Sequence, residues 1–569
     1  MTVISCETVY VSGGQFSWKG DTMIKRITAS VLCTAMCAVS FASCGNTDRG
    51  DGSGYMYNLT LLGNPETLDP QYASDPSANT IIKNMFSGLL STDSSGNINC
   101  CNAESYEVSA NGLEYTFKLR KDNYWFYDKN KDDIIEPEEY FPVTANDYVF
   151  ALKRILDPAM KSPFADKFSC IKHGGSILQG ELAPEMAGLS APDDYTLKIT
   201  LEYPSAEFPE LLASSAAYPC NEEFFYSTKG RYGLDDESIM SNGAFFVRQW
   251  FYDPYGHNNI LYMKANSANE NDHYEISPSF LSFDIKDNEA EIRQAFKEED
   301  TACFTTMNPS GYNPDKYVIS SGNAVTLGLI FNPDDKTYSD LNLRKALSLS
   351  IDREALASQL SSDLQAAYGI IPPAVDLLGR SYRELSSEKM FDVYNVKEAK
   401  GYLEKAKLEL GTSSLESVKI MVNSAVVNSA PLHLLSQSWQ EKLGIYIGIE
   451  DVTDEEFNER IESGDYSIAL YPVKGKSCTG LSVISQFEDT PCLNFSLGGY
   501  RYSTDILRCP TPAELVNAYS SAERGILGQF GFIPIAYKKC YLIVAPDNEE
   551  ISFDPFSGAV DYRLAKNYH

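Results

Sequence analysis

Five positions between Asp128 and Glu139 have the spacing of a calcium-binding loop. Asp128, Asn130 and Asp132 occupy positions 1, 3 and 5 of the 12-residue pattern, and Glu139 occupies position 12. At position 7, Ile134 would contribute its backbone carbonyl oxygen. In such loops, oxygen atoms at alternating positions coordinate the calcium ion, and the carboxylate at position 12 coordinates it with both oxygens. This stretch therefore predicts a calcium site.

Two residues of the same loop depart from the calcium pattern. Asp133 stands at position 6, where a glycine normally makes a sharp turn, and Pro137 stiffens the end of the loop. The alternative is that the loop is an acidic, solvated hairpin tip that binds no metal. The sequence leaves both interpretations open, and it indicates no required cofactor.

A second group of side chains that could bind a ligand lies between residues 469 and 480. Lys474 and Lys476 offer ammonium groups to a carboxylate or another acidic group of a ligand. Tyr471 precedes them and combines apolar area with a hydroxyl group, which suits a recognition surface. The alternative is a solvated pair of lysines in a loop that contacts no ligand.

The composition of the chain excludes two classes of function. Of 569 residues, 78 are acidic and 47 are basic, so the formal net charge is -31, whereas nucleic-acid binding needs clustered Lys and Arg. The chain has no GxSxG, HExxH or phosphate-binding loop. Its 5 histidines offer few candidates for the catalytic base or metal ligands of a hydrolase. We therefore predict a binding protein that is not an enzyme and has no nucleic-acid partner.

The first 54 residues have the pattern of an export and anchoring segment. Lys25 and Arg26 precede the apolar run Ile27–Ser43, which is too short and too rich in small residues for a comfortable membrane span. The run ends at Cys44 in a stretch that resembles the lipobox of bacterial lipoproteins, in which the cysteine is lipidated. We expect residues 1–43 to be a signal peptide with an extension before the true start, Met23. Residues 44–54 form a flexible tether.

The elements that must position these side chains alternate between strands and helices. Tyr115–Arg120 alternates apolar and polar residues and predicts a half-buried strand. Thr144 is a suitable N-cap for a helix from about Ala145, which Asp157 and Pro158 end. A further amphipathic helix is expected over residues 285–299. This alternation indicates an α/β chain.

Five short motifs follow one another in the first third of the chain. They are NPETLDPQ at 64–71, FSGLL at 86–90, YTFKLR at 115–120, PVTAND at 142–147 and ALKRILDP at 151–158. In their order and spacing they resemble the oligopeptide- and dipeptide-binding proteins of ABC importers, a family of extracytoplasmic solute-binding proteins. A later run, LRKALSLSIDRE at 343–354, resembles a further motif of that family. The resemblance extends from about Met56 to His569.

The resemblance implies an α/β fold, a two-lobed periplasmic-binding-protein clamshell of type II with an additional third domain. Lobe I would combine residues 55–86, 199–302 and 536–569, the extra domain would be 87–198, and lobe II would be 303–535. The ligand would lie between the lobes, which close on it about a hinge. In the family the segment with Asn242 and Gly243 lies near the hinge and the ligand, although this pair is also a turn signal in itself.

The function that the resemblance implies is capture of peptides or peptide-like solutes and their delivery to an ABC permease and ATPase complex. We expect a monomer, held by its lipid anchor on the extracytoplasmic face of a bacterial cell membrane. In peptide-binding relatives an aspartate near the position of Lys476 pairs with the α-ammonium of the peptide, and a lysine there would repel that group. The alternatives are an oligosaccharide or a metal chelate as ligand, or a surface sensor without a transport role.

We expect Cys44→Ser to release the protein into the medium or to leave its precursor unprocessed, because the thiol that carries the lipid is lost. Lipid labelling and membrane fractionation measure this. Unchanged membrane retention with normal labelling would contradict lipidation at Cys44.

Overall fold

The computed structural model describes residues 53–568, apart from 94–95, 133–135, 257, 272–273, 358, 360–362, 378, 387–393, 431 and 495–497. Cys44 and Ile134 therefore lie outside the described residues. Residues Gly50–His569 form one compact unit, to which all of the sheets belong. In this described part, no helix has the length and the apolar character needed to cross a membrane.

The first sheet has four strands in the order β1-β12-β11-β10. These strands span Met56–Leu62, Phe280–Lys286, Ile260–Ala265 and Phe245–Phe251, and only β1 and β12 pair in parallel. Helix α2 (Pro76–Met85) contacts β1 and β10, and Asp75 caps its first turn by accepting a hydrogen bond from the Ala78 amide.

The second sheet has the order β4-β5-β9-β8, over Ala103–Val108, Glu114–Leu119, Thr196–Thr200 and Leu189–Asp193. In β5 alternate side chains are buried, so the predicted half-buried strand is confirmed. Helix α3 (Ala145–Leu156) packs beside this sheet. Thr144 and Asp147 form a capping box at its start, and it ends before Asp157, as the sequence predicts.

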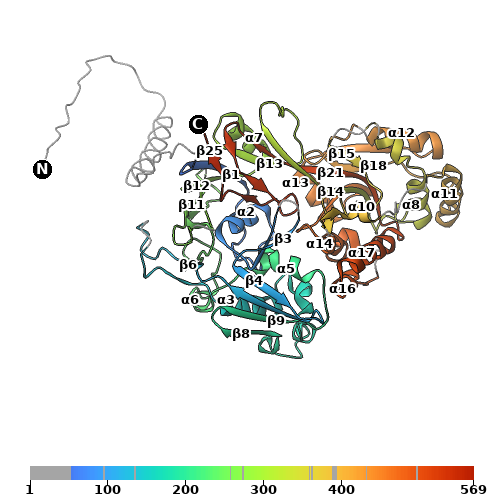
Figure 1. Cartoon of the computed structure of the whole chain (residues 1–569). Helices are drawn as coiled ribbons and strands as arrows, with labels where there is room; N and C mark the ends of the chain where they lie inside the picture. The colour runs from blue at the N-terminus through green and yellow to red at the C-terminus, as the bar shows by residue number, and fades with distance from the viewer. Residues whose placement is uncertain are drawn as a thin grey trace, which may run out of the picture. The chain divides into compact units, whose positions relative to one another are not determined.

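The third sheet has seven strands and lies in the second half of the chain. Its order is β13-β21-β14-β20-β18-β19, with β15 paired to β21. The strands span Cys303–Thr306, Phe532–Val544, Val318–Phe331, Ile468–Lys474, Val418–Asn423, Ile447–Val452 and Leu364–Ala366. Helices α8 (Leu341–Leu349), α11 (Val396–Leu410), α12 (Leu432–Leu443) and α17 (Pro512–Leu527) gather around it in Figure 1.

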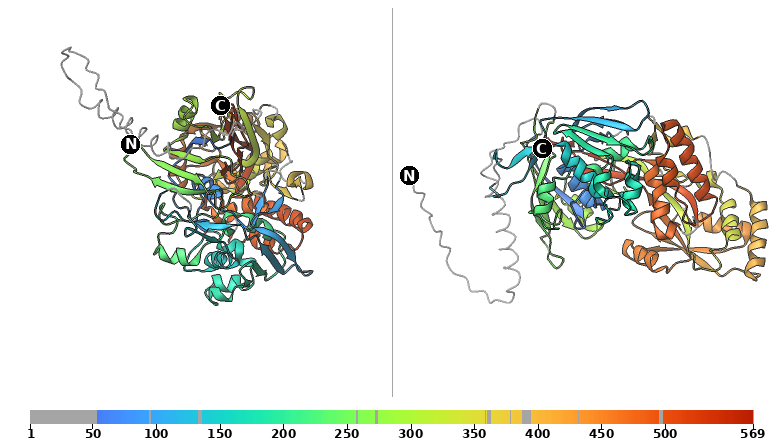
Figure 2. Two further views of the ribbon diagram at one scale, coloured as in Figure 1. Left: turned by 60° about the vertical axis from the view of Figure 1, so that its left-hand side comes forward. Right: turned by 90° about the horizontal axis from the view of Figure 1, so that it is seen from below.

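The two longest strands, β14 and β21, pair side by side through most of their length. In Figures 1 and 2 they run between the blue-to-green elements of the first half and the yellow-to-red helices of the second half. Their register shifts between Asn323 and Val325, and again between Leu327 and Gly328. These irregularities bend and twist the ribbon locally.

One predicted helix is shorter than the sequence pattern indicates. The helix expected over residues 285–299 spans Glu289–Lys297 in the structure, as α7, while Ile285 and Lys286 still belong to β12. Asn288 sets the boundary, because its side chain accepts a hydrogen bond from the Glu291 amide and so caps the first turn.

A buried ion pair joins the first motif to the motif of α3. Arg154 and Asp69, only 4% and 5% exposed, pair through Nη2 and Oδ2. Arg154 Nη1 also donates to Gln71 Oε1 at 2.7 Å, and its guanidinium lies 4.1 Å from the centroid of the Phe225 ring. Hydrogen bonds and the aromatic face thus compensate both buried charges.

We expect Arg154→Met to lower the free energy of unfolding by about 3–5 kcal/mol, because Asp69 would remain as a buried charge without its counterion. Urea denaturation measures the change. Lys419→Met is the control: Lys419 pairs with Glu450 at the surface, with 60% of its side chain exposed, so its loss should cost at most about 1 kcal/mol. Equal losses in the two variants would contradict the special role of Arg154.

Candidate functional site

A small pocket, with a cavity volume of ≈ 60 Å³, forms where five separate segments of the chain meet. These segments are the start of α2 with the residues before it, the 3-10 helix η1 (Ala165–Cys170), helix α5 (Phe208–Ala213) with the short η3 (Ser215–Ala217), the loop after β20, and a loop near the C-terminus. The residues of each segment that line it are Ala73, Ser74 and Asn79; Phe164, Lys167 and Phe168; Glu210, Leu211, Ser214, Ser215 and Ala216; Lys476, Ser477 and Thr479; and Ser557.

The walls of this pocket are mostly apolar or neutral. Phe164, Phe168 and Leu211 supply apolar surface, and Asn79 donates a hydrogen bond to the Ser557 carbonyl oxygen across one edge. Apolar walls exclude water and strengthen the electrostatic interactions of a bound polar group. Such a concave, largely apolar site with few polar groups is typical of ligand binding.

Three charged side chains line the pocket: Lys167 from η1, Glu210 from α5, and Lys476 from the loop after β20. Burial, helped by repulsion from Lys476, lowers the pKa of Lys167 to about 8. Burial, helped by repulsion from Glu207, raises the pKa of Glu210 to about 8. Both groups are therefore poorly solvated in their charged forms, and a counterion from a ligand would stabilise those forms.

Next to the pocket, the first half of the chain contacts the second through Glu207. Tyr519 of α17 donates a hydrogen bond to Glu207 Oε1, and the neighbouring Ala206 amide donates to the Cys509 carbonyl oxygen at 2.8 Å. Burial raises the pKa of Glu207 to about 7. The Tyr519 ring also packs against Gly480, where a Cβ atom would lie 2.5 Å from the ring. Tyr519 thus connects Glu207 to α14 (Gly480–Asp489), which follows the Lys476 loop.

Of the three candidate residues predicted in the 469–480 stretch, the structure places one in the pocket. Lys476 lines it, and its backbone amide donates to Ser482 Oγ at 2.8 Å. Lys474 instead lies near Gly558, outside the pocket lining. Tyr471 packs against Phe457, with 6.3 Å between ring centroids, and is likewise absent from the lining.

Asn242 and Gly243 lie in a buried hydrogen-bond network away from this pocket. Asn242 is fully buried, accepts from the Ser87 amide and donates to Asn123 Oδ1. Gly243 has no positive φ, but a Cβ atom there would lie 2.7 Å from backbone atoms of Met85 and Phe86. In this structure the glycine permits close backbone packing, so both residues hold elements together.

The predicted calcium loop is fastened by contacts within the protein. Glu139 Oε1 and Oε2 accept hydrogen bonds from the Lys129 and Glu136 amides, at 3.2 and 3.4 Å. Asn130 Nδ2 donates to Asp132 Oδ2 at 3.1 Å. Among the described residues, no group of three or more His, Cys, Asp or Glu side chains could hold a metal ion. Because position 134 is not described, the calcium site stays a prediction.

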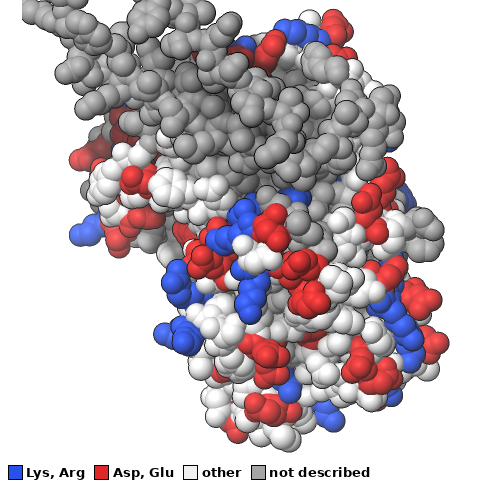
Figure 3. All heavy atoms as spheres, turned by 90° about the vertical axis from the view of Figure 1, so that its left-hand side faces the viewer, with Lys and Arg blue, Asp and Glu red and all other residues white. Residues whose placement is uncertain are grey.

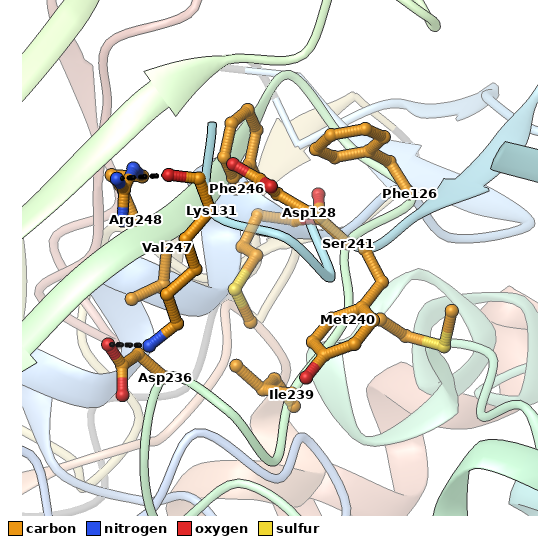
Figure 4. A pocket seen from close by; sticks show the side chains of 12 residues that line it. Phe126, Asp128, Lys131, Asp236, Ile239, Met240, Ser241, Phe246, Val247 and Arg248 are labelled. Carbon is orange, nitrogen blue, oxygen red and sulfur yellow. Dashed lines mark hydrogen bonds and ion pairs between the residues drawn. The ribbon is translucent and has the colours of Figure 1, made fainter. Parts of the chain in front are cut away.

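A second small pocket, with a cavity volume of ≈ 20 Å³, adjoins that loop and is shown in Figure 4. Lys131 forms an ion pair with Asp236 there at 3.5 Å, and Arg248 donates to the Lys131 carbonyl oxygen at 2.8 Å. Asp128 lies beside the rings of Phe126 and Phe246 in the same view. These contacts attach the acidic loop to the residues around 236–248.

Sequence reasoning missed several residues that line or adjoin the pocket, namely Phe164, Lys167, Glu207, Glu210 and Tyr519. One feature could have indicated two of them. Glu207 and Glu210 flank the apolar pair Phe208 and Pro209 at the start of a short helix, an environment that is costly for carboxylates. The other three take their places from tertiary packing alone.

On the face of the molecule that Figure 3 shows, acidic and basic side chains are interspersed. No extended basic patch gathers among the described residues on that face.

Comparisons with known proteins agree on one family. The family model described as bacterial extracellular solute-binding proteins, family 5 Middle, matches residues 101–488. The oligopeptide-binding protein OppA of Bacillus subtilis (strain 168) is 24% identical over 472 residues, covering 81% of this chain and 83% of that protein. The probable deoxycholate-binding periplasmic protein YgiS of Escherichia coli (strain K12) is 24% identical, covering 71% and 72%.

Solved structures show the same fold. The pheromone receptor PrgZ, in a structure of its mode of peptide binding, has a TM-score of 0.70 at 22% identity, covering 90% of this chain and 99% of that chain. Listeria monocytogenes OppA bound to peptide has a TM-score of 0.69 at 21% identity, covering 91% and 99%. The predicted two-lobed α/β fold of type II periplasmic binding proteins is confirmed, while the predicted domain boundaries stay predictions.

We expect the wild-type protein to lose stability between about pH 4.5 and 7 more steeply than Glu207→Gln does. The pKa of Glu207 is raised from 4.5 to about 7, so in this window the folded protein keeps a proton that the unfolded chain releases. The free energy of unfolding therefore falls as pH rises, by at most about 1.4 kcal/mol per pH unit. Urea denaturation at several pH values measures the slope.

Glu104→Gln is the matched control for this experiment, because Glu104 is exposed on β4 and its replacement should leave the wild-type slope unchanged. If Glu207→Gln showed that same slope, the buried carboxylate would not be the titrating group.

Proposed function

The chain belongs to the bacterial extracellular solute-binding proteins of family 5, and from this premise we propose that it captures a peptide or peptide-like solute for an ABC importer. Its curated relatives include proteins named oligopeptide-binding. The family is one of binding proteins, in which the ligand is held without covalent chemistry and passed to a permease and ATPase complex. The observation that carries the proposal is the pocket at the meeting of five chain segments.

The pocket supports capture by closure. Its lining comes from residues 73–216 on one side and from the loop 476–479 on the other, so a ligand would contact two lobes at once. A ligand that contacts both lobes binds their closed arrangement more tightly than an open one, and so shifts the population toward closure. The permease would then recognise the closed form.

We further propose that the protein is a monomer held by lipid on Cys44 at the outer face of a bacterial membrane. The lipobox-like stretch before Cys44 and the polar tether after it support this placement.

A second ligand class has its own support. YgiS, whose printed name gives deoxycholate as its probable ligand, is about as similar to this chain as the oligopeptide-binding relatives are. This likeness supports a ligand other than a peptide, and an oligosaccharide, a chelate or another small solute is the alternative cargo. A surface sensor without transport is the alternative role.

We expect peptides of about two to ten residues to raise the melting temperature of the protein, because a ligand that binds only the folded state stabilises it by mass action. A thermal-shift screen with a peptide library measures this, and the shift should grow with peptide excess. A library of bile acids, oligosaccharides and chelates is the comparison. Shifts confined to that second library would contradict peptide capture.

We propose in addition that the loop 128–139 binds calcium weakly. Repulsion from Asp132 is the largest cause that raises the pKa of Glu136, and Glu139 and Glu138 add to it, so a cation would relieve this repulsion. We expect calcium to raise the melting temperature with a dissociation constant of about 0.1–1 mM, and Glu139→Gln to abolish most of the shift. Equal shifts with magnesium at matched ionic strength would contradict a calcium site.

A further inference from the structure

A further cavity, ≈ 240 Å³ in volume, lies in the first half of the fold beside the end of α2. Its lining comes from described residues between 83 and 123, between 218 and 274, and between 561 and 563. None of these lining residues also lines the pocket that contains Lys476, so the two sites are separate. Because a cavity of about 150 Å³ holds a benzene molecule, this one has room for about ten non-hydrogen atoms.

Two side chains of the cavity wall carry hydrogen-bond donors that the protein leaves available. Tyr218 is only 7% exposed, and its hydroxyl forms no hydrogen bond with any residue that the structure describes. Burial raises the pKa of this hydroxyl, so it stays a neutral donor. Lys83 Nζ lies 3.9 Å from Asp561 Oδ2, which is too long for a hydrogen bond.

These donors lie close together, beside a second positive charge. Tyr218 is the largest of the influences that raise the pKa of Lys83, so the two groups are neighbours in the wall. Arg563 also lines the cavity, where its Nη1 donates to the Glu275 carbonyl oxygen at 2.8 Å. Its guanidinium lies 4.8 Å from the centroid of the Tyr274 ring, and both contacts fix its position.

The same wall offers acceptors. The Asn102 side chain, in a residue that is 5% exposed, makes its described hydrogen bonds through its nitrogen, which leaves Oδ1 as an acceptor. The Asp561 side chain lines the cavity with 31% of its surface exposed. A ligand therefore needs at least one donor as well as an acceptor group to match this wall.

The charges of the wall restrict the ligand further. Lys83 and Arg563 favour an anionic group, whereas Asp561 repels a second negative charge. Arg120 and Asp122 also line the cavity, but they pair with each other through hydrogen bonds of 2.9 and 2.8 Å. A dianion such as phosphate would face two carboxylates, so a single carboxylate fits better.

We infer that this cavity is a second ligand site, for a small monocarboxylate with a hydrogen-bond donor on its α carbon: an α-hydroxy or α-amino acid. Lys83 and Tyr218 donate to the carboxylate, and Asn102 and Asp561 accept from the α substituent. The Phe86 ring, stacked on Tyr218 with 6.2 Å between centroids, gives an apolar ligand side chain a surface to pack on. This site goes beyond the proposed function, because it needs no peptide.

Four molecules of closely similar size test the inference on the wild-type protein by isothermal titration calorimetry. They are leucine, 2-hydroxy-4-methylpentanoate, 4-methylpentanoate, which lacks the α donor, and leucinamide, which lacks the carboxylate. We expect leucine or the hydroxy acid to bind with a dissociation constant of about 1 mM or below, at least about tenfold more tightly than the last two. The tighter of the first two identifies the amino acid or the hydroxy acid as the natural class.

Two variants assign the groups in the wall. Tyr218→Phe and Lys83→Gln should each weaken binding of the tighter acid at least about fivefold. Tyr218→Phe should leave the melting temperature unchanged, because the hydroxyl has no partner among the described residues. The matched controls Tyr226→Phe and Lys198→Gln, exposed and outside the lining, should bind as the wild type does.

Cys101 lines the cavity and reports where the acid binds. In a Cys100→Ser background, the bound acid should slow alkylation of Cys101 by iodoacetamide. Alkylation of Cys492, which lies in the second half of the chain, should be unchanged. Mass spectrometry of the digested protein measures both rates.

Three results would overturn the inference. They are binding of neither acid at about twentyfold the expected dissociation constant, equal binding of all four molecules, and undiminished binding by Tyr218→Phe and Lys83→Gln. Protection of Cys492 with none of Cys101 would place the acid elsewhere and would also overturn it. Because no peptide enters these measurements, a failure of peptide capture would leave the inference standing.

Discussion

The buried ion pair of Asp69 and Arg154 determines how the walls of the pocket are built. It fixes the turn of the first motif against α3, and Ser162 Oγ adds a hydrogen bond of 2.8 Å to the Gln71 carbonyl oxygen. After this turn the chain continues to Ser74 and α2, and after α3 it continues to η1. The ion pair therefore fixes the start of both segments, and each of them lines one side of the pocket. Because an uncompensated buried charge is costly, alternative packings of these segments are strongly disfavoured.

Tyr519 links the two halves of the chain beside the pocket. Its hydroxyl donates a hydrogen bond to the Glu207 carboxylate of the first half. Its ring packs on Gly480, the first residue of α14, just after the loop that carries Lys476. A displacement of α17 relative to α5 would therefore disturb the Glu207 hydrogen bond and the packing under the pocket loop together.

Local sequence patterns predict the elements of this protein well and its site poorly. Strand β5, helix α3 and its Thr144 cap follow from periodicity and capping chemistry, which involve residues close in the chain. Glu210 and Lys476 line the same pocket from positions more than 260 residues apart, and no local pattern encodes this proximity. Gly243 illustrates a second limit: its sequence context indicates a turn, but the approach of the Met85 backbone is what requires glycine there.

The last residues of the chain complete the environment of an early helix. Asn84, 1% exposed near the end of α2, donates to the Val560 carbonyl oxygen at 2.7 Å and accepts from the Tyr562 amide at 2.9 Å. These partners are separated from Asn84 by more than 470 residues, so their contacts form slowly and late in folding. A chain made from its N-terminus cannot satisfy this buried amide until residues 560–562 are available. The burial of Asn84 is therefore completed only when both ends of the folded unit are available.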